Sequence, residues 1–173
     1  MTAPASPART GVWVGIATIT MSFAAYTSAL LVRQGAGSDW QHFRLPSILY
    51  FNTVLLLVSS GTIELGRRRG YAWLIFTLGL GLLFIAGQVL AWRNLAAQGL
   101  FLATNPSSSF FYVFTVLHAL HLLGGIVALG YVLVRLRAPT GGPPLTALGA
   151  VSLYWHFMDV LWLYLLVILA LRL

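Results

Sequence analysis

Five long apolar runs, separated by short polar segments, constrain the fold of this chain more than any other feature. They lie at about residues 10–32, 46–66, 71–92, 110–134 and 145–172. A helix of about 20 apolar residues is long enough to cross the hydrocarbon core of a bilayer. Backbone polar groups inside a bilayer must be satisfied within the protein, which favours helices. The runs therefore predict an all-α membrane protein, a bundle of five transmembrane helices.

The composition supports this interpretation. Hydrophobic residues make up 59% of the 173-residue chain and charged residues only 8%, whereas soluble domains carry about 25% charged residues. The ten basic residues are all arginines beside the apolar runs, a distribution typical of membrane anchors and not of a surface that binds nucleic acid. The chain has no cysteine, which excludes disulfides and thiolate metal sites. Because the sequence shows no internal repeat and no disordered linker, we expect one membrane domain, residues 1–173.

The arginines also predict the orientation. Five helices place the two termini on opposite sides of the membrane. If the N-terminus is inside, six arginines flank the inner helix ends and four flank the outer ends. Because arginine is enriched on the cytoplasmic side, and Arg67–Arg69 form a run in one inner loop, we expect a cytoplasmic N-terminus and a periplasmic C-terminus.

The last apolar run carries a cluster of polar and aromatic side chains. Asp159 lies near its middle, His156 precedes it by three residues, and Trp155 and Trp162 flank it at i−4 and i+3. These spacings place the four side chains on one helical face. A carboxylate at bilayer depth costs at least about 2.5 kcal/mol, so it should face protein and have a partner. We expect a structural carboxylate held by His or Trp donors; a proton relay is the alternative.

His118 and His121 in the fourth run raise the question of a metal or haem. They are spaced i, i+3, and His156 in the last run could serve as the opposing ligand of a haem. A zinc site needs a third ligand and a haem needs ligands from opposite faces, and nothing else in the sequence completes either site. We therefore expect no catalytic or metal site, and hydrogen bonds from these histidines between the fourth and fifth helices. A self-contained membrane cytochrome with haem b is the alternative.

Small residues form a continuous stripe along the first run: Gly11, Gly15, Thr18, Ser22, Ala25 and Ala29. Such a stripe lets another helix approach closely, so we expect it to pack against a neighbour in the bundle or against another subunit. The second and third runs also hold more polar side chains than a lipid-facing helix would keep. The candidate interface or lipid-contact residues are Gly15, Ser22, Asn52, Ser59 and Gln88.

Three segments carry a family resemblance. Residues 154–163, YWHFMDVLWL, resemble the terminal signature of subunit III of the haem–copper oxidases. Residues 118–125, HALHLLGG, resemble that family's two-histidine motif, and residues 52–60, NTVLLLVSS, resemble its Asn-Thr and Ser-Ser segment. The three segments follow in the family's order, on three predicted helices. The chain is similar over nearly its whole length to the short, five-helix form of cytochrome c oxidase subunit III.

This resemblance implies an accessory, non-catalytic subunit of a respiratory terminal oxidase in a prokaryotic inner (plasma) membrane. Family members pack on haem–copper subunit I, bind lipid, protect the enzyme from inactivation during turnover and support proton uptake coupled to oxygen reduction. Haem and copper are then expected in partner subunits, with none in this chain, and phospholipid is a further expected ligand. The partners are oxidase subunits and membrane lipids, and no nucleic acid. A nitric-oxide-reductase-associated or quinol-oxidase homologue is the variant left open.

The chain also departs from the family in its acidic residues. Thr18-Ile19 stand where many members have Ser-Glu, and Gln88 stands near another position that is often Glu. The long form has seven helices in a two-plus-five arrangement around a lipid-filled cleft, and counterparts of its first two helices are not expected here. Roles that depend on those acids or on that cleft are therefore not expected in this chain.

Overall fold

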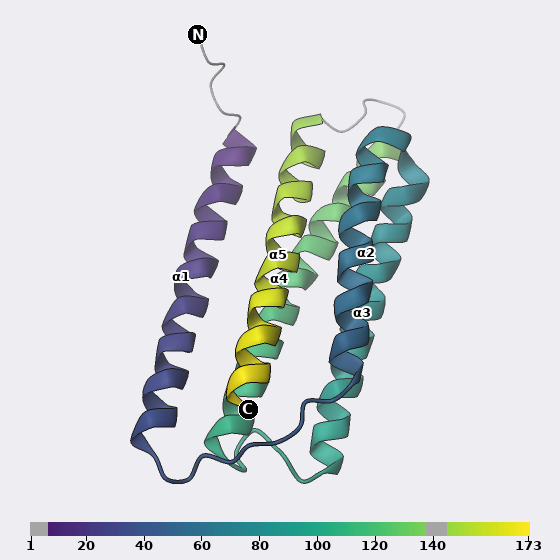
Figure 1. Cartoon of the computed structure of the whole chain (residues 1–173). Helices are drawn as coiled ribbons and strands as arrows, with labels where there is room; N and C mark the ends of the chain where they lie inside the picture. The colour runs from purple at the N-terminus through teal and green to yellow at the C-terminus, as the bar shows by residue number, and fades with distance from the viewer. Residues whose placement is uncertain (1–6, 138–144) are drawn as a thin grey trace.

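The computed structural model describes residues 7–137 and 145–173, which form five helices with consecutive helices running in opposite directions (Figure 1). They are α1 (Pro7–Ala36), α2 (Ile48–Arg69), α3 (Tyr71–Ala97), α4 (Pro106–Arg137) and α5 (Leu145–Arg172). Each is long and apolar enough to cross a membrane. The predicted fold class is confirmed. The prediction of one domain also covers residues 1–6 and 138–144, which lie outside the described residues, and it stays a prediction.

Several helix ends differ from the sequence-based ranges because local chemistry extends or delays them. α4 begins at Pro106, where a missing N–H does no harm, and Asn105 caps it by accepting a hydrogen bond from the Ser108 N–H at 2.7 Å. α2 and α3 are joined by Gly70 alone. Its φ of 105° is a left-handed conformation that favours glycine. This single residue allows α2 and α3 to form a tight antiparallel hairpin.

The five helices do not share their contacts equally. α4 packs against α1, α3 and α5, while α5 packs against α1, α2 and α4. α2 and α3 make the closest pair in the bundle. Within the described chain α1 contacts only α4 and α5, so it stands at one side of the other four helices (Figure 1).

The connector between α1 and α2 closes the end of α5. The Trp40 indole N–H donates to the Arg172 carbonyl at 3.0 Å, and the Phe43 backbone N–H donates to the Leu173 carbonyl at 2.8 Å. The Nδ1 atom of His42 lies 3.2 Å from the same Leu173 oxygen. Carbonyls in the last turn of a helix lack partners within that helix. The connector supplies those partners and ties the C-terminal end of α5 to the segment between α1 and α2.

Candidate functional site: the polar interior of the bundle

Trp155 connects α5 to three other helices. Its side chain is fully buried, and its indole N–H donates to the Ser59 hydroxyl of α2 at 2.9 Å. A Cβ atom added to Gly81 of α3 would lie 2.9 Å from the indole ring, and one added to Gly125 of α4 would lie 3.6 Å from it. Two glycines on neighbouring helices therefore leave the space that this ring fills, which is the small-residue packing expected in a membrane bundle.

Trp162 makes a second link, two turns further along α5. Its indole N–H donates to the Thr53 hydroxyl of α2 at 3.0 Å. Its ring centroid lies 4.9 Å from that of Phe84, with the rings perpendicular, and 5.1 Å from that of His118. Perpendicular aromatic pairs are a favoured arrangement. The structure therefore brings Trp162 and His118 of the predicted cluster together, on α5 and α4, with Phe84 of α3 between the helices.

His118 is the most enclosed of the four histidines. It is 0% exposed, and neither ring nitrogen has a hydrogen-bond partner among the described residues. Its nearest aromatic neighbours are Trp162 and Phe84, whose centroid lies 5.8 Å from that of the imidazole. His118 is thus held by aromatic packing and not by the interhelical hydrogen bond that the sequence suggested.

His156 and Asp159 lie where α5 meets α2. The Nδ1 atom of His156 is 2.6 Å from the Ser60 hydroxyl oxygen, and its Nε2 atom is 3.4 Å from that of Ser152. Asp159 is only 4% exposed, and neither carboxyl oxygen has a hydrogen bond within the described chain. The Ser60 hydroxyl lies next to this carboxyl but outside hydrogen-bonding geometry. The expected pairing of Asp159 with His or Trp donors is therefore not formed.

Helix geometry explains this correction. Side chains three or four residues apart lie on the same face of a helix, where each can bond to the next helix instead of to the other. For α5 that helix is α2, whose hydroxyl groups lie at the matching depth. The N–H groups of Trp155 and Trp162 are satisfied by those hydroxyls, so neither indole is left to donate to the carboxyl of Asp159.

His121 also differs from its expected role. It is half-buried, and its Nδ1 atom lies 2.7 Å from the Leu117 carbonyl of its own helix. The link between α4 and α5 at this level comes from Tyr154, whose hydroxyl donates to the His121 backbone carbonyl at 2.9 Å. The prediction that the histidines form hydrogen bonds between the fourth and fifth helices is therefore wrong, since His156 uses α2 and His121 uses its own turn.

Asn52, Ser59 and Gln88, which the sequence offered as interface or lipid-contact residues, lie inside the bundle and not on its lipid-facing side. All three are fully buried inside the chain. Asn52 packs directly on the backbone of Gly87 in α3. The amide groups of Asn52 and Gln88 have no hydrogen-bond partner among the described residues. Polar side chains in membrane helices face the bundle interior because hydrocarbon offers them no hydrogen bonds, and these three follow that rule.

Gly15 and Ser22, in contrast, remain at the surface of α1. No atom lies within 4 Å of the position that a Cβ on Gly15 would take. Ser22 is exposed, and its hydroxyl donates to the Thr18 carbonyl of its own helix at 2.9 Å. α1 instead turns larger side chains such as Phe23 and Leu30 into the bundle. The small-residue stripe therefore does not pack against a neighbour within the described chain.

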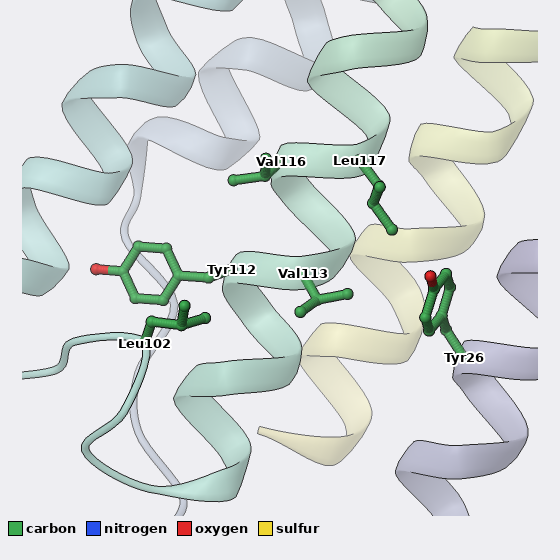
Figure 2. Close-up of a pocket in the computed structure, with 6 residues that line it drawn as sticks. All are labelled: Tyr26, Leu102, Tyr112, Val113, Val116 and Leu117. Atoms are coloured by element: carbon green, nitrogen blue, oxygen red, sulfur yellow. The ribbon is translucent and has the colours of Figure 1, made fainter.

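Two apolar hollows flank α1, each with a volume of about 360 Å³. In the first, between α1 and α4, Tyr26 faces Val113 and Leu117 across the gap (Figure 2). The second lies on the other side of α1, against α5, where Phe157 and Tyr164 form part of its wall. The complete lining of the first is Tyr26, Leu102, Tyr112, Val113, Val116 and Leu117.

Charged and metal-ligating groups are sparse in residues 7–137 and 145–173. In these ranges no three or more His, Cys, Asp or Glu side chains gather closely enough to hold a metal ion. Glu64 pairs with both Arg67, at 2.9 Å, and Arg68, at 3.4 Å. This ion pair lies at the end of α2.

Sequence reasoning missed three links between helices, all made by hydroxyl groups. The sequence does contain a signal for each link, namely a threonine within an apolar run. Spacing along one helix does not, however, identify a partner on another helix. The links are Thr62 with Thr77 at 2.8 Å, Trp92 with Thr115 at 3.0 Å, and Tyr164 with Thr27 at 2.8 Å. Together they connect α2 to α3, α3 to α4 and α5 to α1.

Comparison with known proteins gives a consistent result. The family model described as cytochrome c oxidase subunit III matches residues 16–171. The probable cytochrome c oxidase subunit 3 of Mycobacterium tuberculosis is 35% identical over 159 residues, which cover 85% of this chain and 77% of the relative. The cytochrome c oxidase subunit 3 of Corynebacterium diphtheriae is 34% identical, covering 82% and 74%. That of Thermostichus vulcanus is 30% identical, covering 92% and 84%.

Proposed function

The chain belongs to the cytochrome c oxidase subunit III family, and from this premise we propose that it packs on the oxidase subunit that holds the haem–copper centre. It is an accessory subunit of a cytochrome c oxidase and a multi-pass protein of a prokaryotic membrane. The findings lend no support to the quinol-oxidase and nitric-oxide-reductase variants or to a self-contained haem b cytochrome.

The observation that carries the proposal is the convergence of the three motif segments. Trp155 and Trp162 of the terminal signature reach Ser59 and Thr53 of the Asn-Thr and Ser-Ser segment, and Trp162 also packs on His118 of the two-histidine motif. These motif residues are used to join α2, α4 and α5. A rigid bundle of this kind supports a role in holding and covering a partner subunit in the membrane.

In the proposed complex, electron transfer and oxygen reduction take place at the haem and copper of partner subunits. This chain contributes a membrane face that stabilises the catalytic subunit, slows its inactivation during turnover and supports proton uptake. Buried polar groups such as Asp159 then serve structure, and they are not obligatory proton carriers. The support for this assignment is the burial of that carboxyl beneath α2 and the use of its neighbouring donors in helix–helix contacts.

We also propose that phospholipid occupies the hollow between α1 and α4. Its walls are apolar, as acyl chains require, and Tyr26 marks its α1 side (Figure 2). About one turn further along α1 lies a larger hollow of about 650 Å³, lined partly by Ala29, Arg33 and Asn105. Arg33 is paired there with Asp39, which lines the same hollow, so the lining offers a headgroup polar partners and no unpaired cation. The two hollows together fit one lipid, with chain in the first and headgroup in the second.

The cytoplasmic location of the N-terminus is part of the same proposal. Because the chain has no native cysteine, single cysteines can report the accessibility of each end of the bundle. Ser38, in the connector between α1 and α2, and Arg69, at the last residue of α2, are both exposed. In intact cells, Ser38→Cys should react with a membrane-impermeant thiol reagent and Arg69→Cys should not, while both should react after the membrane is permeabilised. The reverse pattern in intact cells would overturn the orientation.

The test of the main proposal is purification of the complex through an affinity tag on this chain. In mild detergent, a haem- and copper-containing oxidase subunit should co-purify in equal amount, recognised by mass spectrometry and by its haem absorption. Membranes from cells without this chain should lose oxygen consumption progressively during turnover, and restoring the chain should prevent that loss. Purification of the tagged chain without any haem–copper subunit would overturn the proposal.

A further inference from the structure

Half of the arginines of this chain lie at one end of the bundle, where α2 and α4 end and α3 begins (Figure 1). The whole sequence has three acidic residues, and Glu64 is the one at this end. Asp39 lies in the connector at the other end and Asp159 lies in the middle of α5. This end is therefore strongly basic. We call its arginines the basic tip: Arg67, Arg68, Arg69, Arg135 and Arg137.

The basic tip lies where the membrane spans end. The candidate spans Ile48–Arg69 and Pro106–Arg137 both finish in it, and the candidate span Tyr71–Ala97 starts beside it. All five arginines are exposed. Side chains at the end of a membrane span lie level with the lipid headgroups and not with the acyl chains. Arginines at this level can therefore reach the phosphate groups of the surrounding lipid.

Glu64 compensates only part of this charge. It pairs with Arg67 at 2.9 Å and with Arg68 at 3.4 Å. Arg69 and Arg137, in contrast, form no salt bridge within the described chain. No other acidic side chain of the sequence lies near enough to serve them, since the other two acids are in the connector and in the middle of α5. Two guanidinium groups at the headgroup level thus require an anion from outside the chain.

The guanidinium of Arg137 is held in position by an aromatic ring. Its Cζ atom lies 4.6 Å from the centroid of the Tyr71 ring, at the first residue of α3. A cation–π contact uses no N–H donor, so the donors of this guanidinium remain available, and arginine can bind two phosphate oxygens at once. Arg69 stands two residues before Tyr71, across Gly70. The ends of α2 and α4 therefore bring two unpaired cations close to one tyrosine.

We propose that the basic tip binds the headgroup of an anionic phospholipid, with Arg69 and Arg137 as the residues that hold its phosphate. The excess of positive charge favours a headgroup with a net negative charge over a zwitterionic one. This site lies at the opposite end of the bundle from the hollow lined by Arg33, whose charge Asp39 compensates. It is a second lipid site, and it requires no contact with an oxidase subunit.

The first test is native mass spectrometry of the full-length chain, titrated with phosphatidylglycerol or with phosphatidylcholine of the same acyl chains. The wild-type chain should bind phosphatidylglycerol about tenfold more tightly. The double variant Arg69→Gln with Arg137→Gln should lose this preference while its thermal unfolding stays unchanged. The control, Arg93→Gln with Arg172→Gln, removes two exposed arginines at the other end and should keep the preference. No preference in the wild-type chain, or an equal loss in both variants, would overturn the inference.

The second test identifies the source of the anion. Inorganic phosphate at the same concentration should not displace phosphatidylglycerol, because it lacks acyl chains; displacement would make the basic tip a site for free phosphate and overturn the lipid assignment. In the purified complex, the photoreactive amino acid benzoylphenylalanine at Leu136, exposed on α4 between Arg135 and Arg137, should give lipid adducts. Adducts with an acidic segment of another subunit would overturn it. Failure to co-purify a haem–copper subunit would refute the proposed function and leave the lipid preference unaffected.

Discussion

α1 and the group formed by α2 to α5 use the same kinds of residue in different ways. On α1 the hydroxyls of Thr18, Thr20 and Ser22 donate to carbonyls of their own helix. On α2 the hydroxyls of Ser59 and Thr53 accept hydrogen bonds from tryptophans of α5. Thr27 is the α1 hydroxyl that reaches another helix, through Tyr164. A polar residue in a membrane helix therefore strengthens the bundle only where a neighbouring helix offers the complementary group.

The glycines show the same difference. Gly81 and Gly125 lie beneath the side chains of Trp155 and Tyr154, whereas Gly11 and Gly15 of α1 have no atom within 4 Å of an added Cβ. Glycine can admit a close neighbour, but only packing reveals whether a neighbour is there. α2 to α5 are locked by matched large and small residues, and α1 is held by fewer contacts along one side. Five changes would break or sharpen this comparison.

Gly81→Leu should have the largest effect, because its side chain would collide with Trp155. Overpacking of a filled core costs about 1–3 kcal/mol or more of folding free energy. Thermal and denaturant unfolding in detergent measure the loss. Gly79→Leu on the exposed side of the same helix, where nothing lies within 4 Å, is the matched control and should be nearly neutral. Equal stability of the two variants would contradict the described contact between Gly81 and the Trp155 ring.

Trp155→Phe should be the next most damaging change, since it removes both ring volume and the hydrogen bond to Ser59. A double-mutant cycle with Ser59→Ala isolates the hydrogen bond. We expect a coupling energy of about 0.6 kcal/mol, the average for hydrogen bonds between membrane helices, and at most about 1.7 kcal/mol. Trp13→Phe serves as the control because Trp13 is 54% exposed on α1. A coupling energy near zero would mean that the indole and the hydroxyl do not interact.

Asp159→Ala should weaken assembly more than it weakens the chain itself. No donor in the described chain holds the carboxyl, so the unfolding free energy should change by only about 1 kcal/mol. Retention in the oxidase should fall more than turnover does in complexes that keep the variant, with Asp159→Asn less affected because the amide still accepts hydrogen bonds. Turnover and proton pumping are then measured in complexes that retain the variant. Normal assembly without pumping in Asp159→Asn would make this carboxyl part of a proton path.

Gly15→Leu should barely change the stability of the isolated chain, by less than about 0.5 kcal/mol, because the site is open. Its comparison with Gly81→Leu tests the difference between α1 and the other helices directly. If the stripe meets another subunit, co-purification with the oxidase should decrease even though the chain stays folded. Unchanged co-purification would place the stripe against lipid, and a large loss of stability in the isolated chain would contradict the described position of α1.

The smallest effect is expected at the exposed ion pair between Arg33 and Asp39, whose atoms lie 2.7 Å apart. Hydrogen bonding from Arg33 lowers the pKa of the Asp39 carboxyl below its ordinary value. The pair therefore contributes stability above the unfolded-state pKa, and this contribution is lost as the pH falls through the folded-state pKa. Comparing wild type with Asp39→Asn by thermal unfolding from neutral to acidic pH should show a slightly weaker pH dependence in the variant. A stronger dependence of stability on pH in Asp39→Asn than in wild type would contradict the expected loss of this contribution at low pH.

Much of the candidate site was visible in the sequence, but its connections were not. The residues Trp155, Trp162 and His118 could be chosen because polar or amphipathic side chains are unusual in apolar runs. Their partners could not, since Asp159 seemed the natural acceptor from spacing alone. The hydroxyls of α2 are the acceptors because α2 packs on that face of α5. For the same reason the sequence offers Asn52 and Gln88 only as interface or lipid-contact residues, and their neighbours in the fold place them in the interior.

The sequence by itself determined the five helices, because apolar length, backbone hydrogen bonding and flanking arginines act along the chain. It also determined the family, through three motifs in order. Only the tertiary structure decided which side of each helix faces protein. In a soluble helix the apolar face marks the core, but lipid and core are equally apolar, so hydrophobic periodicity does not separate them. For this reason the sequence could not show that the stripe of α1 faces outward whereas Gly81 faces Trp155. Both are small residues on apolar helices.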